Sequence, residues 1–232
     1  MPTNSEILRS KIDLLAPRMN HAAGRVWEHP NFRELFPEFM FTIHSIIRAT
    51  HPSMKVAAAC AAERAATDPV CAAMAHYLAE HAEEEEGHDD WALADLAVMG
   101  VSAEKVRRRL PSPTVAQMVG SQYYWMQHYH PVAYLSYIAV LESPPSIEFL
   151  EEKVRSSGMP RDAFRTWFFH GQLDHGHVRE FDKLVDSLPL TDWHHEILGL
   201  NAIHTADMQA QAFEEVVEAF EESAAMSMVA RA

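Results

Sequence analysis

Residues 81–96 read HAEEEEGHDDWALADL and residues 170–177 read HGQLDHGH, and these two segments decide the fold and the site that we expect. An α-helix advances about 100° per residue, so positions i, i+4 and i+7 share one face. His170, Asp174 and His177 have this spacing. The second segment therefore predicts a helix that presents three metal-ligand side chains in one direction.

The first segment has the same one-sided pattern within a helix predicted over residues 69–99. Glu83 and Glu86 fall off the polar face and are expected to be solvated. The residues on the face are His81, Glu84, Glu85 and His88, continued by Tyr77 and Asp95.

Glu142 ends a third predicted helix, over residues 131–142, and its neighbours on that helix are apolar. Ala139, Ile138 and Leu135 precede it by three, four and seven residues. A buried carboxylate must be paired, protonated or bound to a metal, because an uncompensated buried ion costs several kcal/mol. A metal cation is the partner that we expect.

The donor types indicate which metal. Carboxylates and imidazoles without thiolates suit non-haem iron or manganese better than zinc. Helical bundles build carboxylate-bridged sites partly from Glu/His pairs at i, i+3, and Glu85 and His88 have this relation. An acidic run taken alone is more typical of a solvated face. Here, however, two helices each carry possible ligands on one face, and Glu142 has apolar neighbours. Together these features favour a metal site over a solvated acidic face.

These segments, with VGSQYYWMQHYHPVAYLSYIAVLE at residues 119–142, resemble the haem-oxygenase-like di-iron oxidases and oxygenases, iron-containing redox enzymes of the TENA/PqqC-like fold. The resemblance covers roughly residues 30–185. It implies an all-α, compact helical bundle that binds two Fe²⁺ ions, with manganese as an alternative. It also implies an O₂-dependent oxidation of a small carboxylate, amine or amino acid, by N-oxygenation, oxidative decarboxylation or C–C cleavage.

The same resemblance implies a ligand set. In that family one helix gives an acidic residue and a His, a second gives a Glu, and a third gives His-x₃-Asp-x₂-His. The acidic ligand of the first helix precedes its His by three or by seven residues, here Glu85 or His81, and Glu84 is a further alternative. We favour Glu85, with His81 as an added ligand or as a donor that orients the carboxylate. The implied metal residues are Glu85, His88, Glu142, His170, Asp174, His177 and His81.

Four further residues are candidates for substrate binding. His44 and Arg48 lie one helical turn apart, and Arg48 could bind a carboxylate through two parallel hydrogen bonds. The alternative is that Arg48 caps a helix end or pairs with one of the acidic residues. Tyr124 and His128 belong to an aromatic segment that either lines the pocket or forms part of the core and its rim.

Composition limits the partners. The net charge of −14 argues against binding to nucleic acid or to anionic membrane surfaces. No stretch reaches the roughly 18–20 apolar residues of a membrane span, and the first residues are not typical of a signal peptide. Two cysteines, Cys60 and Cys71, agree with a reducing compartment. We expect a cytoplasmic homodimer whose other partners are O₂ and a small-molecule substrate.

A single domain over residues 1–232 is expected, with about the last eight residues frayed, because no linker or repeat divides the chain. Only 8 glycines and long Ala/Leu/Glu-rich segments indicate helices and little strand. The helices are predicted near residues 5–27, 31–50, 53–67, 69–99, 102–108, 114–129, 131–142, 146–157, 160–186 and 190–224.

Other functions fit the sequence less well. It has no G-x-S-x-G nucleophile motif, P-loop or G-x-G-x-x-G fingerprint. Three rivals share the expected fold: a cofactorless oxidase like pyrroloquinoline quinone synthase, a thiaminase-like hydrolase that needs a nucleophilic Cys60 or Cys71, and a haem oxygenase that needs a proximal histidine, for which His21 is the candidate. A non-enzymatic metal-binding or interaction protein is a fourth alternative.

Overall fold

The computed structural model describes residues 1–142 and 145–229, except for the side chains of residues 173–177 and 228–229. Every regular element in this described part is helical, so the predicted all-α class is confirmed. The helices are α1 (Asn4–Asp13), α2 (Ala16–Trp27), α3 (Phe32–Arg64), α4 (Pro69–Glu84), α5 (His88–Val98), α6 (Ala103–Arg108), α7 (Pro113–His128), α8 (Ala133–Leu141), α9 (Ile147–Ser157), the 3₁₀ helix η1 (Arg161–Phe164), α10 (Arg165–Ser187) and α11 (Asp192–Val229).

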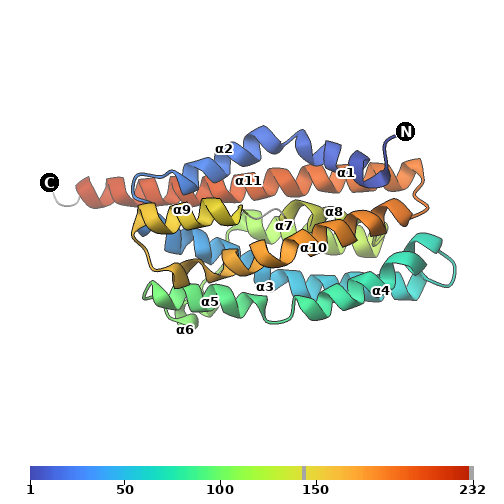
Figure 1. The fold of residues 1–232 in the computed structure, drawn as a ribbon, viewed down its shortest axis with the longest axis horizontal. Helices are drawn as coiled ribbons and strands as arrows, with labels where there is room; N and C mark the ends of the chain where they lie inside the picture. The colour runs from blue at the N-terminus through green and yellow to red at the C-terminus, as the bar shows by residue number, and fades with distance from the viewer. Residues whose placement is uncertain (143–144, 230–232) are drawn as a thin grey trace.

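The helices form an elongated bundle in which the longest ones run along its length (Figure 1). α3 packs against α4, α5 and α7, and α11 packs against α1, α2, α7 and α8. α4 and α5 follow one another along one side of the bundle, and α10 crosses in front of α3 in this view. Segments from the start, middle and end of the chain thus meet in the interior.

α3 is a single helix, although the sequence predicts a break near Pro52. Proline lacks an N–H group and normally leaves helix carbonyls without a donor. Here the Ser53 hydroxyl donates to the carbonyl of Ala49 at 2.8 Å, and the Tyr134 hydroxyl donates to the carbonyl of Thr50 at 3.1 Å. These bonds do not replace the missing donor to the Arg48 carbonyl, but they hold the next two carbonyls, and the one from Tyr134 ties this part of α3 to α8.

Two predicted helices are divided instead. The segment predicted as 5–27 becomes α1 and α2, and the segment predicted as 69–99 becomes α4 and α5. Gly87 lies between α4 and α5 with φ of 85°, in the left-handed region that favours glycine. At the other end of the chain, α11 runs to Val229, into the segment for which fraying is predicted.

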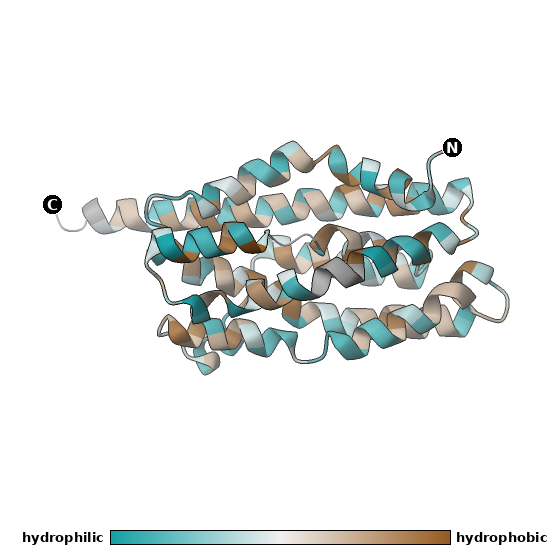
Figure 2. Ribbon diagram, viewed as in Figure 1, coloured by the Kyte–Doolittle hydropathy of each residue, from teal (hydrophilic) through white to brown (hydrophobic). Residues whose placement is uncertain are grey.

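Two apolar cores fill the bundle. One is rich in aromatic rings from α2 and α3, such as Trp27 and Phe39, and the other contains Met54 and Tyr137. Outward faces are more hydrophilic, as α9 shows in Figure 2. None of the described helices is both long and apolar enough to cross a membrane. A cavity lies where the two cores meet, lined by residues of both.

Candidate metal centre

Three of the predicted ligands come together inside the bundle. Glu85, His88 and His170 each offer a ligand atom, and these atoms all lie within 4.8 Å of one another. The imidazole rings of His88 and His170 meet edge to face, with 5.2 Å between their centroids. Glu85 Oε2 is 3.3 Å from His88 Nδ1. α4, α5 and α10 therefore converge on one group of metal-ligand side chains.

The turn at Gly87 brings Glu85 and His88 together. Glu85 is the C-cap of α4, and His88 is the first residue of α5. The prediction that both belong to one stripe of one continuous helix is wrong, because the helix ends between them. The pairing itself is present, since a single left-handed glycine turns the chain so that both side chains face α10. The neighbouring Glu83 and Glu86 are exposed, as the sequence predicts.

Glu142 reaches the same place from the end of α8. Its Oε1 lies 3.0 Å from Nε2 of His81, and the same nitrogen lies 3.8 Å from Glu85 Oε1. The other ring nitrogen of His81 is 3.0 Å from the Tyr77 hydroxyl. His81 thus connects both carboxylates, which agrees with either predicted role, added ligand or donor that orients a carboxylate.

The remaining two predicted ligands, Asp174 and His177, lie outside the described side chains. The backbone of α10 is helical through both positions. Their part in the site stays a prediction.

The charges suit metal binding. His170 Nδ1 lies 2.8 Å from the carbonyl of Thr166, so this nitrogen carries the proton and Nε2 keeps a free lone pair. Burial lowers the pKa of His170, which keeps the ring neutral. Burial acts to raise the pKa of Glu85, but the bond to His88 and nearby histidine charge outweigh it, so the net pKa is lowered and the carboxylate stays ionised. An ionised Glu85 and a neutral His170 ring are the states of these two side chains that a divalent metal requires.

A cavity of about 180 Å³ opens beside this group. His81, Glu142 and His170 form part of its wall, and Thr166 lines it one helical turn before His170. The rest of the wall is almost entirely apolar and comes from both cores. A molecule in this cavity would contact the metal-ligand residues directly.

None of the predicted substrate-binding residues lines this cavity. His44 is buried with its Nε2 3.9 Å from Asp89 Oδ2, and Arg48 is exposed. Tyr124 is exposed and stacks with His128, with 5.1 Å between the ring centroids. These four residues lie elsewhere because the cavity-facing side of α3 is apolar and because the aromatic segment lies at the C-terminal end of α7. Their assignment to substrate binding is not supported by this cavity.

Comparison with known structures identifies the architecture. The chain is similar to a crystal structure of a domain of unknown function with a heme oxygenase-like fold from Shewanella denitrificans, with a TM-score of 0.80 and 14% identity over 95% of this chain and 94% of that chain. This fold is haem-oxygenase-like. A TenA homologue from Pseudomonas syringae pv. tomato matches with a TM-score of 0.66 and 13% identity, covering 89% of this chain and 92% of that chain. A TenA homologue from P. horikoshii matches with a TM-score of 0.58 and 14% identity, covering 90% of this chain and 98% of that chain.

No protein-family model and no curated protein sequence matches the chain. The low identities of the structural matches show a common fold alone. The predicted haem-oxygenase-like, all-α architecture is confirmed, and any activity must be argued from the site.

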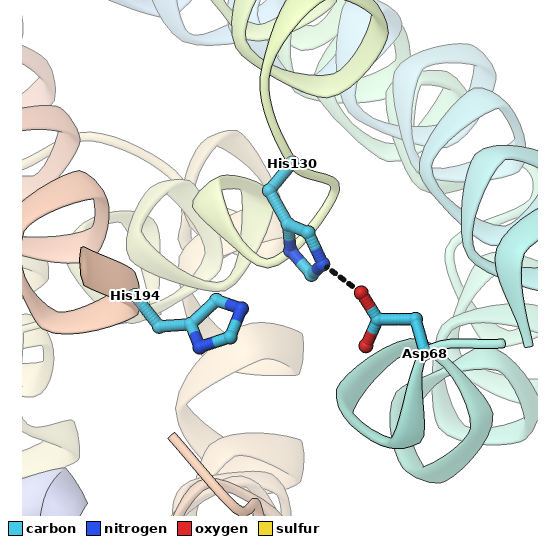
Figure 3. Close-up of side chains that lie close together, drawn as sticks. All are labelled: Asp68, His130 and His194. Carbon is cyan, nitrogen blue, oxygen red and sulfur yellow. Dashed lines mark hydrogen bonds and ion pairs between the residues drawn. The ribbon is translucent and has the colours of Figure 1, made fainter. Parts of the chain in front are cut away.

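A second cluster of possible ligands lies elsewhere in the haem-oxygenase-like bundle, where Asp68, His130 and His194 approach one another within 4.8 Å (Figure 3). The Nδ1 atoms of its two histidines accept hydrogen bonds, whereas Nδ1 of His170 donates one. The N–H group of Val132 donates to His130 Nδ1 at 3.1 Å, and that of Thr191 donates to His194 Nδ1 at 3.1 Å. In a neutral ring the proton must then sit on Nε2.

Protons therefore occupy the nitrogens that a metal would need. His130 Nε2 is 2.8 Å from Asp68 Oδ2 and donates to it, and burial lowers the pKa of His194. The other oxygen of Asp68 caps α4 by accepting from the N–H groups of Val70 and Cys71. We interpret Asp68 and His130 as a hydrogen-bonded clamp between α4 and the segment before α8, and the ring of His194 from α11 packs against His130 with 4.8 Å between the ring centroids.

Asp95 has a role that sequence reasoning missed. The sequence places it on the ligand face of the first segment, but its Oδ2 accepts from the N–H group of Thr166 at 2.9 Å. Phe164, the N-cap residue of α10, offers no side-chain cap, so Asp95 caps α10 from α5. The capped turn also provides the carbonyl that fixes His170. The only sequence signal was an acidic residue in an otherwise apolar stretch, and its partner lies 71 residues away.

Proposed function

We propose that the chain is a non-haem, dinuclear iron enzyme that uses O₂ to oxidise a small molecule bound in the cavity. The observation that carries the proposal is the convergence of Glu85, His88 and His170, with Glu142 connected to them through His81. Carboxylate and neutral imidazole donors fit iron and manganese. The predicted ligands Asp174 and His177 on α10 would complete a set large enough for two ions.

Iron bound at these residues would supply the electrons for O₂ reduction, which protein side chains alone cannot supply. The chain's own residues have separate tasks. Glu85 remains ionised, the ring of His170 presents the lone pair of Nε2, and His88 lies beside both as a further ligand. The cavity limits water around the ligands and holds a substrate against His81, Glu142 and His170.

Two rivals lose support from the described residues. A thiaminase-like hydrolase needs a nucleophilic thiol, but neither Cys60 nor Cys71 lines the cavity. Burial raises the pKa of Cys71 to about 12, so its thiolate is scarce at neutral pH. A haem oxygenase needs a histidine facing the haem, but His21 is exposed and is not part of the cavity wall.

The test is anaerobic titration of the metal-free protein with Fe(II), followed by exposure to O₂. We expect about two irons per chain and oxidation of the bound iron when O₂ is added. His88→Ala and His170→Ala should each lower the stoichiometry, whereas Glu83→Ala, which removes an exposed carboxylate from the same acidic run, should not.

A saturating stoichiometry below one iron per chain in the folded wild-type protein would contradict the dinuclear proposal. Equal losses in Glu83→Ala and in the ligand variants would contradict the assignment of ligands. Iron binding without any O₂ reaction would favour the non-enzymatic metal-binding alternative.

A further inference from the structure

The wall of the cavity beside the metal centre is selective in its chemistry. Its apolar side chains include Ile43, Ile46, Ile47, Met54, Ile138 and Leu141, from α3 and α8, and aromatic rings of α2, α10 and α11 complete it. Among the described residues that line it there is no lysine and no arginine. An amino acid bound here would have to bury an ammonium and a carboxylate group, and the wall offers no cation for the latter. Burial of an unpaired charge is strongly unfavourable.

The polar groups of the wall are few. His81, Glu142 and His170 belong to the metal centre, and the other described polar side chains, those of Thr50, Tyr137, Thr166 and Gln209, are uncharged. Tyr137 is fully buried, and its hydroxyl interacts with the neighbouring Thr50 hydroxyl without forming a hydrogen bond of good geometry, although buried hydroxyl groups normally form one. With the hydroxyl of Thr50, it can satisfy one polar group of a bound molecule. The cavity can therefore pair an uncharged polar group of a ligand with these side chains or bind it at the metal, but its described lining offers no cation for a second, charged group, and apolar surface encloses the rest of the ligand.

The size of the cavity limits the ligand. Its volume is about 180 Å³, and a dry apolar cavity of about 150 Å³ is sufficient to bind benzene. The space therefore suits an apolar body of about six to eight carbon atoms.

We propose that this cavity binds a molecule with an apolar body of about six to eight carbons and one terminal polar group, and that it rejects free amino acids. This inference rests on the proposed function only for the placement of the polar group at the metal centre. It replaces the sequence-based expectation of a carboxylate held by Arg48, because Arg48 is exposed and absent from the wall.

The test uses the full chain after removal of metal with a chelator, so that it does not depend on iron binding. Straight-chain primary alcohols of four to twelve carbons are titrated by calorimetry, because a neutral head group avoids repulsion by Glu142. We expect the dissociation constant to fall about fourfold with each added carbon and to level off near six to eight carbons. Leucine and lysine should show no binding at concentrations that saturate the site with octanol.

Two matched variants locate the binding. Ile47→Trp fills the cavity from α3 and should abolish alcohol binding. Ile203→Trp makes the same change at a half-buried isoleucine of α11 that does not line the cavity, and binding should be unchanged. If Ile47→Trp does not fold, Ile47→Ala enlarges the cavity instead and should move the levelling-off point to longer alcohols.

Affinity that is independent of chain length would overturn the proposal. Tighter binding of leucine or lysine than of octanol, or equal effects of the two tryptophan variants, would also overturn it. These results are separate from the test of the proposed function, because a protein that bound alcohols but no iron would retain the apolar site and lose only the dinuclear assignment.

Discussion

Replacing Asp95 by asparagine should make the metal-free protein more stable at neutral pH, although it removes a charged helix cap. Asp95 is fully buried, and burial raises its pKa from 3.8 to about 6 despite the hydrogen bond from Thr166 N–H. At about 1.4 kcal/mol per pH unit between these two values, ionising Asp95 costs the folded state about 3 kcal/mol. Asparagine keeps an oxygen that can accept from Thr166, and it carries no charge.

The sign of the pH dependence follows from the raised pKa. A carboxyl group with a higher pKa in the folded state than in the unfolded state favours folding most when both states are protonated, below the unfolded pKa. This contribution declines above pH 3.8 and is lost as the pH rises through about 6. Between pH 4.5 and 7.5 the wild-type protein should lose about 2 kcal/mol that the variant Asp95→Asn retains.

Urea unfolding of the two proteins at pH 4.5 and 7.5, followed by circular dichroism after treatment with a chelator, measures this difference. The stability of the variant relative to the wild type should rise by about 2 kcal/mol from the lower to the higher pH. A relative stability that is the same at both pH values would refute the reasoning, because it would mean that Asp95 has the same pKa in the folded and unfolded states. Asp95→Ala, which leaves Thr166 N–H without a partner, should be less stable than Asp95→Asn by about 1–3 kcal/mol at both pH values, because neither variant carries a charge at this position.

Three other outcomes are expected. Glu142→Ala should reduce iron binding measured by anaerobic titration while helical content is retained, and Glu83→Ala should match the wild type, because only the first carboxylate contacts the site. Tyr134→Phe should lower the free energy of unfolding by about 1 kcal/mol in urea titrations, because it removes a donor beside the proline of α3; an unchanged value would show that the helix does not need this bond. His130→Ala should cost about 1–3 kcal/mol at neutral pH, and less as the pH falls and Asp68 becomes protonated, because the clamp loses its bond to that carboxylate; a loss that does not change with pH would contradict this account.

The sequence predicted the all-α class, and it singled out several of the side chains that converge in the candidate site, for a local reason. Helical spacing places His170 and the residues that follow it on one face, and apolar neighbours identify Glu142 as a residue that needs a partner. These features depend on the period of a helix and on the cost of burying charge, which act within a few residues. The sequence alone did not show that the helix ends at Gly87, because an isolated glycine in a helical pattern can either be tolerated within the helix or end it.

The tertiary structure alone decided the features that join distant segments. The cap that Asp95 places on α10, the donor that Tyr134 supplies to α3 and the apolar cavity between the two cores all depend on packing between helices far apart in the sequence. Arg48 is a further example. The sequence shows that Arg48 lies one helical turn from His44, but it does not show that the side chain of Arg48 faces solvent. Periodicity shows which side chains of a helix point in the same direction, and only the packing of one helix against another decides whether that direction leads to the candidate site, to the core or to solvent.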